Sequence, residues 1–304
     1  MSNPAPVALP TLRQLEYVVA VADESSFGTA ASSCHVSQPG LSAQVREVEQ
    51  LLGVRLFDRD RRGVVVTPVG MEVVERARAL LTSARELVTA AKARSRPLVG
   101  PFRLGVIPTI APYLLPAALP AVRRAFPELR LILREEKTGD LLELLAKGGI
   151  DAALMATDVR LGDVETAPLF DDAFLLAMPS AHALSARKQV TERDLDGERV
   201  LLLEDGHCLR DQTLAVCDRA GADENAELRA TSLATLVQMV AGGEGVTLLP
   251  EIAVAVVAGK GSGIVVRPFK APAPSRKLGL AWRRGSSRGD EMRMLALSLA
   301  GRRR

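Results

Sequence analysis

The sequence has few cysteines, few histidines and few aromatic residues. Its 304 residues include three cysteines and three histidines, and aromatic residues make up 3%. Three cysteines are too few for the disulfide framework of a small secreted protein. No Cys/His cluster has the spacing of zinc ligands, so neither a metal nor a cofactor is expected.

Long apolar runs are also missing. The most apolar late stretch, residues 246–258, is interrupted by Pro250 and Glu251 and is too short to span a membrane. The first ten residues have neither the basic start nor the apolar run of a secretory signal. We therefore expect a cytoplasmic protein without membrane association.

The composition is otherwise that of an ordinary globular protein. Apolar residues make up 47% and charged residues 25%, and the length suits two or three domains. The net charge of +3 does not by itself indicate a nucleic-acid partner. Any such indication must come from local patterns.

The first 66 residues have helical periodicity followed by a basic hairpin. A first helix has one apolar face, a short helix follows over residues 28–33, and a third helix runs to about Leu52. Ser37 suits the N-cap of the third helix, with Pro39 in its first turn. Residues 55–66 resemble a small wing. This order predicts a winged helix-turn-helix over residues 1–66, although periodicity alone also allows a plain helical bundle with a solvated basic loop.

In a winged helix-turn-helix, the third helix enters the major groove and the wing contacts the backbone or the minor groove. Double-stranded DNA is therefore the expected partner. The candidate contacts are Ser37, Gln38, Pro39, Ser42, Gln44 and Arg46 on the helix and Arg59, Arg61 and Arg62 in the wing.

A long helix is predicted over residues 67–96. Thr67 and Pro68 provide a cap and a first-turn proline. Apolar residues then recur with heptad steps at Val73, Ala77, Leu80, Ala84, Leu87 and Ala91. The seam favours a linker helix that pairs two chains, and the alternative is a helix packed on its own domain.

Residues 97–304 alternate strand-like and helical stretches. The strands are expected at 102–107, 129–134, 151–156, 174–178, 200–203, 245–249 and 278–282. Such alternation predicts an α/β domain with largely parallel sheets.

Cys208 and Cys217 lie nine residues apart, and His207 and Arg210 flank the first of them. If a helix begins just before Cys208, its N-terminus favours a thiolate, which can attack the O–O bond of a peroxide. In a continuous helix the two cysteines would lie on opposite faces, about 13 Å apart along the axis, whereas a disulfide requires Cα atoms about 4.4–6.8 Å apart. Oxidation to a disulfide would then unwind the helix; two inert buried cysteines are the alternative.

Several segments, in this order and spacing, resemble the LysR-type transcription regulators. They include residues 12–24, Ser26-Phe27-Gly28-Thr29-Ala30-Ala31, Val36-Ser37-Gln38-Pro39-Gly40-Leu41-Ser42, residues 51–59 and Thr67-Pro68-Val69-Gly70. The resemblance implies a dimer joined by the linker helix and an α/β regulatory domain of two periplasmic-binding-protein-like lobes. We expect lobe I at about 97–170 and 276–304 and lobe II at about 171–275.

The motif Gly206-His207-Cys208-Leu209-Arg210-Asp211-Gln212 is similar to that of the peroxide-sensing members of this family. That resemblance implies Cys208 as the peroxidatic and Cys217 as the resolving cysteine. It also implies that Thr109, Thr138 and His207 hold peroxide or water near the sulfur and that Arg276 favours the thiolate. Arg210 and Asp211 are further candidates, or they pair with neighbouring residues.

These features together predict a transcription regulator that senses hydrogen peroxide and is not an enzyme. The disulfide would refold residues 205–220 and change the geometry of a homodimer or homotetramer, and with it the promoter binding of antioxidant genes. RNA polymerase is a further expected partner. Two alternatives remain: a regulator that binds a metabolite between the lobes, and a thiol enzyme that turns over peroxide.

Overall fold

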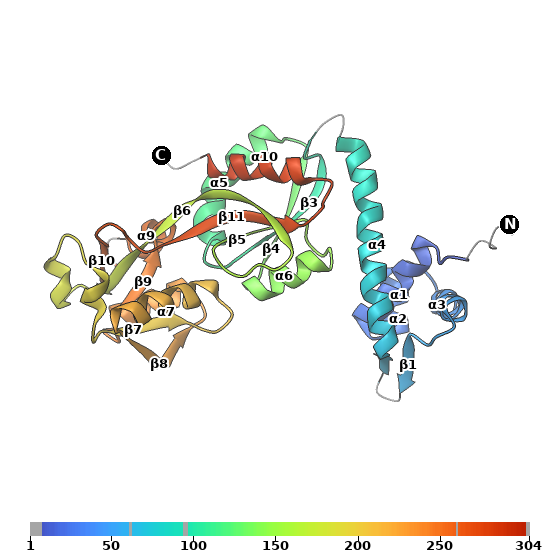
Figure 1. Ribbon diagram of the computed structural model, residues 1–304, viewed down its shortest axis with the longest axis horizontal. Helices are drawn as coiled ribbons and strands as arrows, with labels where there is room; N and C mark the ends of the chain where they lie inside the picture. The colour runs from blue at the N-terminus through green and yellow to red at the C-terminus, as the bar shows by residue number, and fades with distance from the viewer. Residues whose placement is uncertain (1–7, 61–62, 94–96, 260, 302–304) are drawn as a thin grey trace, which may run out of the picture. The chain divides into compact units, whose positions relative to one another are not determined.

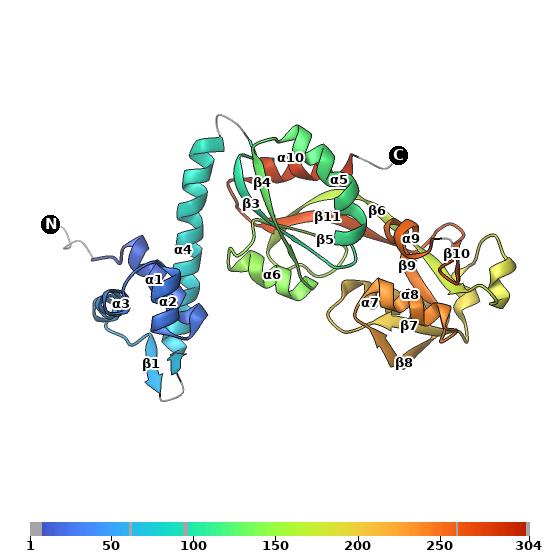
Figure 2. The same cartoon turned by 180° about the vertical axis from the view of Figure 1, so that it is seen from behind.

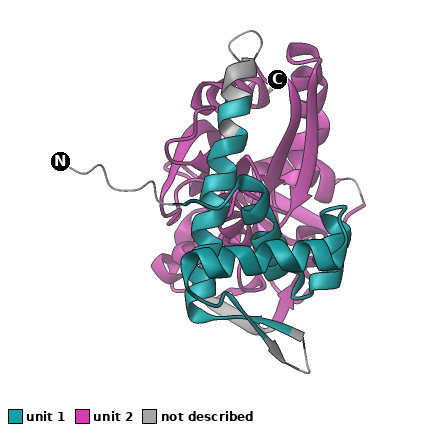
Figure 3. Ribbon diagram, turned by 90° about the vertical axis from the view of Figure 1, so that its right-hand side faces the viewer, with its two compact units in different colours: residues 1–92 teal, residues 93–304 magenta. Residues whose placement is uncertain are grey.

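The computed structural model describes residues 8–60, 63–93, 97–259 and 261–301. The chain divides into two compact units, residues 1–92 and 93–304 (Figure 1, Figure 3). Within the described residues, none of the helices combines the length and apolar character that crossing a bilayer requires.

The first unit contains three short helices, a two-stranded hairpin and one long helix. Their bounds are α1 Leu12–Glu24, α2 Phe27–Ser33, α3 Gln38–Leu52, β1 Phe57–Asp60, β2 Gly63–Val66 and α4 Pro68–Ala93. The predicted caps are confirmed: the Ser37 hydroxyl accepts a hydrogen bond from Gly40 N at 3.3 Å, and Gly53 ends α3 with φ +69°. Thr67 Oγ1 likewise accepts from Gly70 N at 2.9 Å. Polar capping and turn glycine therefore set these boundaries locally.

Helix α4 has two apolar faces rather than the single predicted seam. Val74 packs on the core of the helix-turn-helix, while Ala77 and Leu81 form a small cluster with Leu15 of α1. The expectation that Ala77 belongs to an outward seam is therefore wrong, because its side chain is buried against its own unit. Leu80 and Leu87 are exposed at 56% and 73%. The side chain of Ala91 lies outside the described residues.

The second unit is a mixed α/β structure. Its elements are β3 Gly100–Val106, α5 Ala111–Ala125, β4 Leu129–Glu135, α6 Thr138–Ala146, β5 Ala152–Ala156, β6 Val164–Pro179, η1 Ala183–Ala186, η2 Glu192–Leu195, β7 Arg199–Leu203, α7 Cys208–Ala220, β8 Asp223–Ala230, α8 Leu233–Ala241, β9 Thr247–Pro250, α9 Glu251–Val257, β10 Ile264–Pro268, β11 Ser275–Arg283 and α10 Gly289–Ala300.

The expectation of largely parallel sheets is wrong. The seven-stranded sheet has the order β10-β6-β11-β5-β3-β4, with β9 paired to β6. In this sheet β3 pairs in parallel with β4 and β5, whereas the other four pairings are antiparallel. The chain returns through the sheet on the long strands β6 and β11 instead of using only helical crossovers, so these pairs run in opposite directions. A separate two-stranded sheet, β7–β8, is parallel.

Two apolar cores define two lobes in this unit. The first lobe is built around residues such as Phe102, Leu104 and Trp282, and the second around Phe174 and Val237. In the first lobe, α5 and α10 cover one face of the sheet and α6 covers the other (Figure 1, Figure 2). Strand β6 contributes to both cores and therefore joins the lobes.

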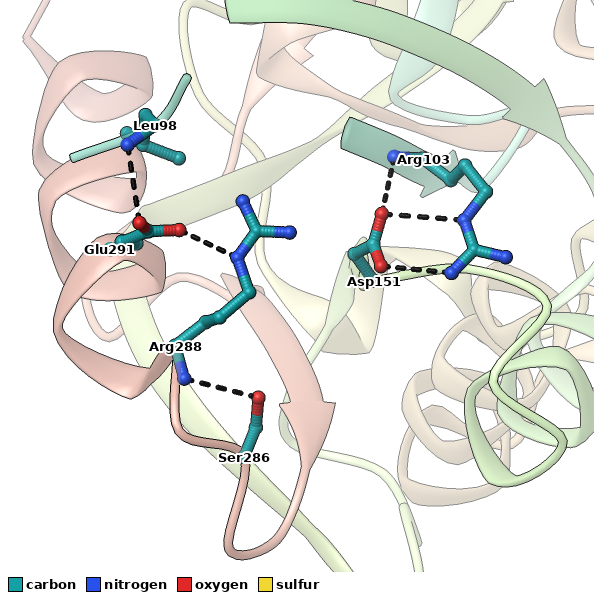
Figure 4. A network of polar contacts seen from close by, with 6 residues as sticks. All are labelled: Leu98, Arg103, Asp151, Ser286, Arg288 and Glu291. Atoms are coloured by element: carbon teal, nitrogen blue, oxygen red, sulfur yellow. Dashed lines mark hydrogen bonds and ion pairs between the residues drawn. The ribbon is translucent and has the colours of Figure 1, made fainter. Parts of the chain in front are cut away.

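Buried charged groups fix the edge of the first lobe (Figure 4). Glu291 of α10 accepts hydrogen bonds from Leu98 N at 3.3 Å and from Arg288 Nε at 2.6 Å. The Arg288 guanidinium also lies 4.9 Å from the centre of the Phe102 ring. A separate pair joins Arg103 to Asp151, whose carboxylate accepts from both the backbone and the side chain of Arg103. The Leu98–Glu291 bond holds the start of the unit against its last helix, and the Arg103–Asp151 pair holds β3 against the segment that leads into β5.

Candidate DNA-binding face and redox site

Three of the predicted DNA-contacting residues lie at the start of α3. Ser37, Gln38 and Pro39 are exposed there, at a helix N-terminus where backbone N–H groups are also directed outward. Gln44 and Arg46 lie further along the helix. Gln44 Nε2 donates to Glu47 at 3.1 Å, and Arg46 Nε donates to the Ser42 carbonyl at 3.1 Å.

The other predicted DNA contacts are Ser42, which is buried, and the wing arginines, whose side chains lie outside the described residues. The Ser42 side chain is only 8% exposed and so faces the core of the unit, which leaves it poorly placed for a base. Arg59 pairs with Val64 in the hairpin. Arg61 and Arg62 lie outside the described residues, as does the side chain of Arg59.

Cys208 is the first residue of α7, and Cys217 lies in the same helix. Both are free thiols and both are buried, at 6% and 2% exposure. They nevertheless belong to different cores, because Cys208 packs in the first lobe and Cys217 in the second. Helix α7 thus inserts its first residue into the lobe opposite the one that holds the rest of its buried face.

The continuous helix prevents a disulfide in this arrangement. Nine residues of α-helix separate Cys208 from Cys217 by about 13 Å along the axis, about twice the longest usual Cα–Cα distance of a disulfide. A bond between them requires the first turns of α7 to unwind and Cys208 to leave the first core. The positive φ of Gly206, +91°, makes the turn that leads into this helix.

Opposing influences set the ionisation of Cys208. Burial raises the pKa of its thiol, while the neighbouring Thr138 hydroxyl and the Arg276 guanidinium lower it, and the Asp158 carboxylate raises it. Thr138 Oγ1 is buried and has no hydrogen-bond partner of full geometry among the described residues. The Thr138 hydroxyl lowers the pKa of the Cys208 thiol as a hydrogen-bond donor, so it can donate to the sulfur or to a bound oxygen.

Arg276 organises the inner side of the site. Its Nη1 donates to Thr109 Oγ1 at 2.9 Å and its Nη2 to the Thr109 carbonyl at 3.1 Å. Its Nε donates to Asp172 Oδ2 at 3.0 Å, and both members of this ion pair are fully buried. Arg276 therefore fixes Thr109 from two directions, and the hydroxyl of Thr109 keeps its own proton for another oxygen.

His207 lies next to Cys208 and is also buried. Burial, and then the charge of Lys137, lowers the pKa of His207, while Glu204 raises it. Its Nε2 has no hydrogen-bond partner among the described residues. Lys137 Nζ pairs instead with Glu204 at 2.6 Å and donates to the Asp205 carbonyl at 3.0 Å. His207 Nε2 lies 3.9 Å from Glu204 Oε1, beyond hydrogen-bond distance, and the lowered pKa favours the neutral imidazole.

Arg210 pairs with a neighbouring residue, which is one of the two roles predicted for it. Arg210 Nε donates to Asp205 Oδ1 at 2.8 Å, and Arg229 holds the other oxygen of that carboxylate at 3.1 Å. Asp211 is exposed. Thr138 is the first residue of α6, and Lys137 rather than Thr138 takes the N-cap position of that helix. A hydroxyl that is not needed for capping can serve the thiol.

A cavity of about 610 Å³ opens beside these residues. Its lining includes Thr109, Tyr113, Lys137, Glu204 and His207, which come from both lobes. Water-sized molecules can therefore reach two of the predicted peroxide-holding residues. The described residues contain no group of three or more His, Cys, Asp or Glu that could hold a metal ion.

The sequence-based prediction missed four side chains that shape the site: Lys137, Asp158, Asp172 and Gln212. Lys137 precedes Thr138, and Gln212 belongs to the motif around Cys208, so both could have been singled out. Asp158 and Asp172 carry no local signal, because their partners are more than 50 residues away in the chain.

The two units match the two family models of one class of bacterial regulator. Residues 12–71 match the bacterial regulatory helix-turn-helix protein, lysR family, and residues 95–301 match the LysR substrate binding domain. The chain belongs to the LysR family.

Among its relatives, the DNA-binding transcriptional dual regulator OxyR of Escherichia coli K12 is 43% identical over 291 residues, which cover 96% of this chain and 95% of the relative. A probable hydrogen peroxide-inducible genes activator of Streptomyces viridosporus is 42% identical, covering 95% and 93%. Full-length OxyR of Pseudomonas aeruginosa, a cysteine-to-aspartate variant, superposes with a TM-score of 0.79 at 38% identity, covering 96% and 98%. A hydrogen peroxide-bound cysteine mutant of Corynebacterium glutamicum OxyR gives 0.67 at 36%, covering 97% and 93%.

Proposed function

We propose that this protein is a DNA-binding transcription regulator that senses hydrogen peroxide through Cys208. The observation that carries the proposal is the position of this thiol at the start of α7, beside Thr138 and Arg276, with the second thiol Cys217 in the same helix. The names of its relatives, which are peroxide-inducible gene activators and OxyR, support the same function. These relatives are named as regulators, and we propose that this protein is likewise a regulator and not an enzyme.

The proposed chemistry has two balanced steps. The Cys208 thiolate attacks one peroxide oxygen, the O–O bond breaks, and the leaving hydroxide takes a proton to become water. Sulfur is oxidised to a sulfenic acid and the peroxide is reduced. The Cys217 thiol then attacks the Cys208 sulfur, the S–O bond breaks, and a second water leaves as the disulfide forms. No further oxidant is needed.

Three side chains are proposed to hold the peroxide. Thr138 donates to the reacting sulfur or to the nearer peroxide oxygen, and Thr109, fixed by Arg276, orients the peroxide from the other side. His207 contributes to the cavity lining, and its buried Nε2, which has no hydrogen-bond partner among the described residues, is proposed to hydrogen-bond to the departing oxygen. Arg276 stabilises the thiolate through its charge. Arg210 and Asp211 are proposed only to stabilise the loop and the first turn of α7.

The switch is proposed to be a change in packing. Disulfide formation withdraws Cys208 from the first core and unwinds residues 205–220, which alters the surface that the regulatory unit offers to a second chain. In a homodimer or homotetramer this would change the spacing of the DNA-binding units, and hence the half-sites that they span. The exposed Leu80 and Leu87 of α4 support a linker helix that pairs two chains.

The proposed organisation follows these roles. Residues 1–66 form the DNA-binding head, 67–96 the linker helix and 97–304 the redox-sensing domain, whose lobes comprise about 97–170 with 276–304 and about 171–275. The head is proposed to bind double-stranded DNA at promoters of antioxidant genes, where RNA polymerase is the further partner. Contact with chromosomal DNA places the protein in the cytoplasm.

The proposal is tested by mass spectrometry of the full chain after one equivalent of hydrogen peroxide, together with footprinting on the region upstream of its own gene. We expect an intramolecular Cys208–Cys217 disulfide and a changed footprint. Cys208→Ser should abolish both, and Cys34→Ser, which removes the remaining cysteine, should leave both unchanged. A footprint that still responds to peroxide in Cys208→Ser would refute the proposal.

A further inference from the structure

Helix α7 is tied to the two lobes by side chains at its two ends. Near its C-terminal end, Arg219 makes hydrogen bonds of 3.1 and 3.2 Å to the two carboxylate oxygens of Glu192 in the second lobe. Near its N-terminal end, Gln212 Nε2 donates to Asp158 Oδ1 at 2.8 Å. Asp158 follows β5 of the first lobe, so this bond crosses from one lobe to the other.

Asp158 is in turn fixed to the sheet of the first lobe. Its second carboxylate oxygen accepts from Lys277 N of β11 at 3.2 Å. Gln212 lies one turn after Cys208 on α7, and positions four residues apart share one face of a helix. The chain of contacts from Lys277 through Asp158 to Gln212 therefore holds the same turn that inserts Cys208 into the first core.

Disulfide formation affects the Arg219–Glu192 and Gln212–Asp158 contacts differently. Cys217 lies in the second core, so the Arg219–Glu192 pair can persist when the bond forms. Cys208 must leave the first core and move toward Cys217, and the turn that carries Gln212 must unwind with it. The Gln212–Asp158 bond is therefore one that the switch has to break.

Asp158 also acts on the sulfur through its charge. The charged groups that influence the Cys208 thiol are Arg276, which lowers its pKa, and Asp158, which raises it. His207 is adjacent but its own pKa is lowered, and Lys137 and Glu204 act on that imidazole. The carboxylate of Asp158 thus opposes the guanidinium of Arg276.

We propose that Asp158 is a positioning residue for the redox switch: through Gln212 it holds the first turn of α7, and with it Cys208, against the first lobe, and its negative charge slows the oxidation of Cys208. The rate at which the protein responds to a given peroxide concentration would then be set in part by this carboxylate. This inference rests on the proposed function.

The test measures the rate of Cys208 oxidation in the reduced full-length protein, followed by timed alkylation and mass spectrometry, between about pH 6 and pH 9. Asp158→Asn removes the charge and keeps one acceptor oxygen. It should speed oxidation on the order of threefold near neutral pH and shift the pH profile to lower pH, with the two rates converging at high pH. The matched control is Asp163→Asn, which removes an exposed carboxylate of the same loop that pairs with Arg284, and it should leave the profile unchanged.

Gln212→Leu removes the Gln212–Asp158 hydrogen bond but keeps the negative charge of Asp158. This variant therefore separates the effect of the hydrogen bond from the effect of the charge. It should leave the pH midpoint of oxidation unchanged and speed the second step, from sulfenic acid to disulfide, by several-fold. An unchanged pH profile in Asp158→Asn, or an unchanged second step in Gln212→Leu, would overturn the inference while peroxide still oxidised Cys208. Absence of Cys208 oxidation in the unsubstituted protein would instead overturn the proposed function.

Discussion

Replacement of Arg276 by alanine is expected to destabilise the regulatory unit strongly. Arg276 and Asp172 are both fully buried, and the guanidinium also satisfies the hydroxyl and the carbonyl of Thr109. Arg276→Ala leaves the Asp172 carboxylate buried without its cationic partner, although Ile252 N still donates to Asp172 Oδ1 at 3.1 Å. Breaking a buried ion pair by removing one partner costs about 3–5 kcal/mol in free energy of unfolding.

The loss should be visible as a lower melting temperature. In a unit of this size each kcal/mol lowers Tm by about 2–4 °C, so the expected decrease is roughly 6–20 °C. The single tryptophan of the chain, Trp282, is buried in the first lobe, and its fluorescence therefore reports the unfolding of this unit. Thermal unfolding followed by tryptophan fluorescence measures the effect.

A double variant distinguishes the buried charge from lost packing. Asp172→Leu combined with Arg276→Met removes both charges and keeps most of the volume, so it should be less destabilised than Arg276→Ala. A decrease in Tm below about 2 °C for Arg276→Ala, or an equal decrease in the double variant, would contradict the argument from the unpaired carboxylate.

Further predictions concern the thiol, the neighbouring imidazole, the cap and the linker helix. Thr138→Val removes a hydroxyl that favours the Cys208 thiolate and should slow oxidation by roughly tenfold or more, measured as the rate of thiol loss at neutral pH. Burial lowers the pKa of His207, so the folded state binds fewer protons than the unfolded state and stability falls as pH drops below about 6.5; His207→Asn should reduce that loss in denaturant unfolding at about pH 7.5 and pH 5.5. Ser37→Ala removes the N-cap of α3 and should cost about 1 kcal/mol and weaken DNA binding, measured by denaturation and fluorescence anisotropy. Leu87→Glu should weaken self-association about tenfold or more in sedimentation equilibrium, whereas unchanged association would exclude this face of α4 from the interface.

Local signals determined the first unit almost completely. The cap at Ser37, the prolines at 39 and 68 and the glycine at 53 act within one turn of the chain, so the helix boundaries follow from the order of residues. In the same way, the motif around Cys208 predicts a reactive thiol with Cys217 as its partner, and the helical rise between them implies that a disulfide needs unwinding.

Only the tertiary structure decided which groups meet at that thiol. Arg276 meets Thr109 across 167 positions and Asp172 across 104, and Gln212 meets Asp158 across 54. Strands β8 and β10 and the first half of β6 also escaped the sequence pattern, because their pairing depends on neighbours that are distant in the chain. Residue types and spacing predict a cysteine that can be oxidised. Burial, a buried guanidinium and an opposing carboxylate shift the pKa of its thiol, and these arise from packing between segments that no local pattern connects.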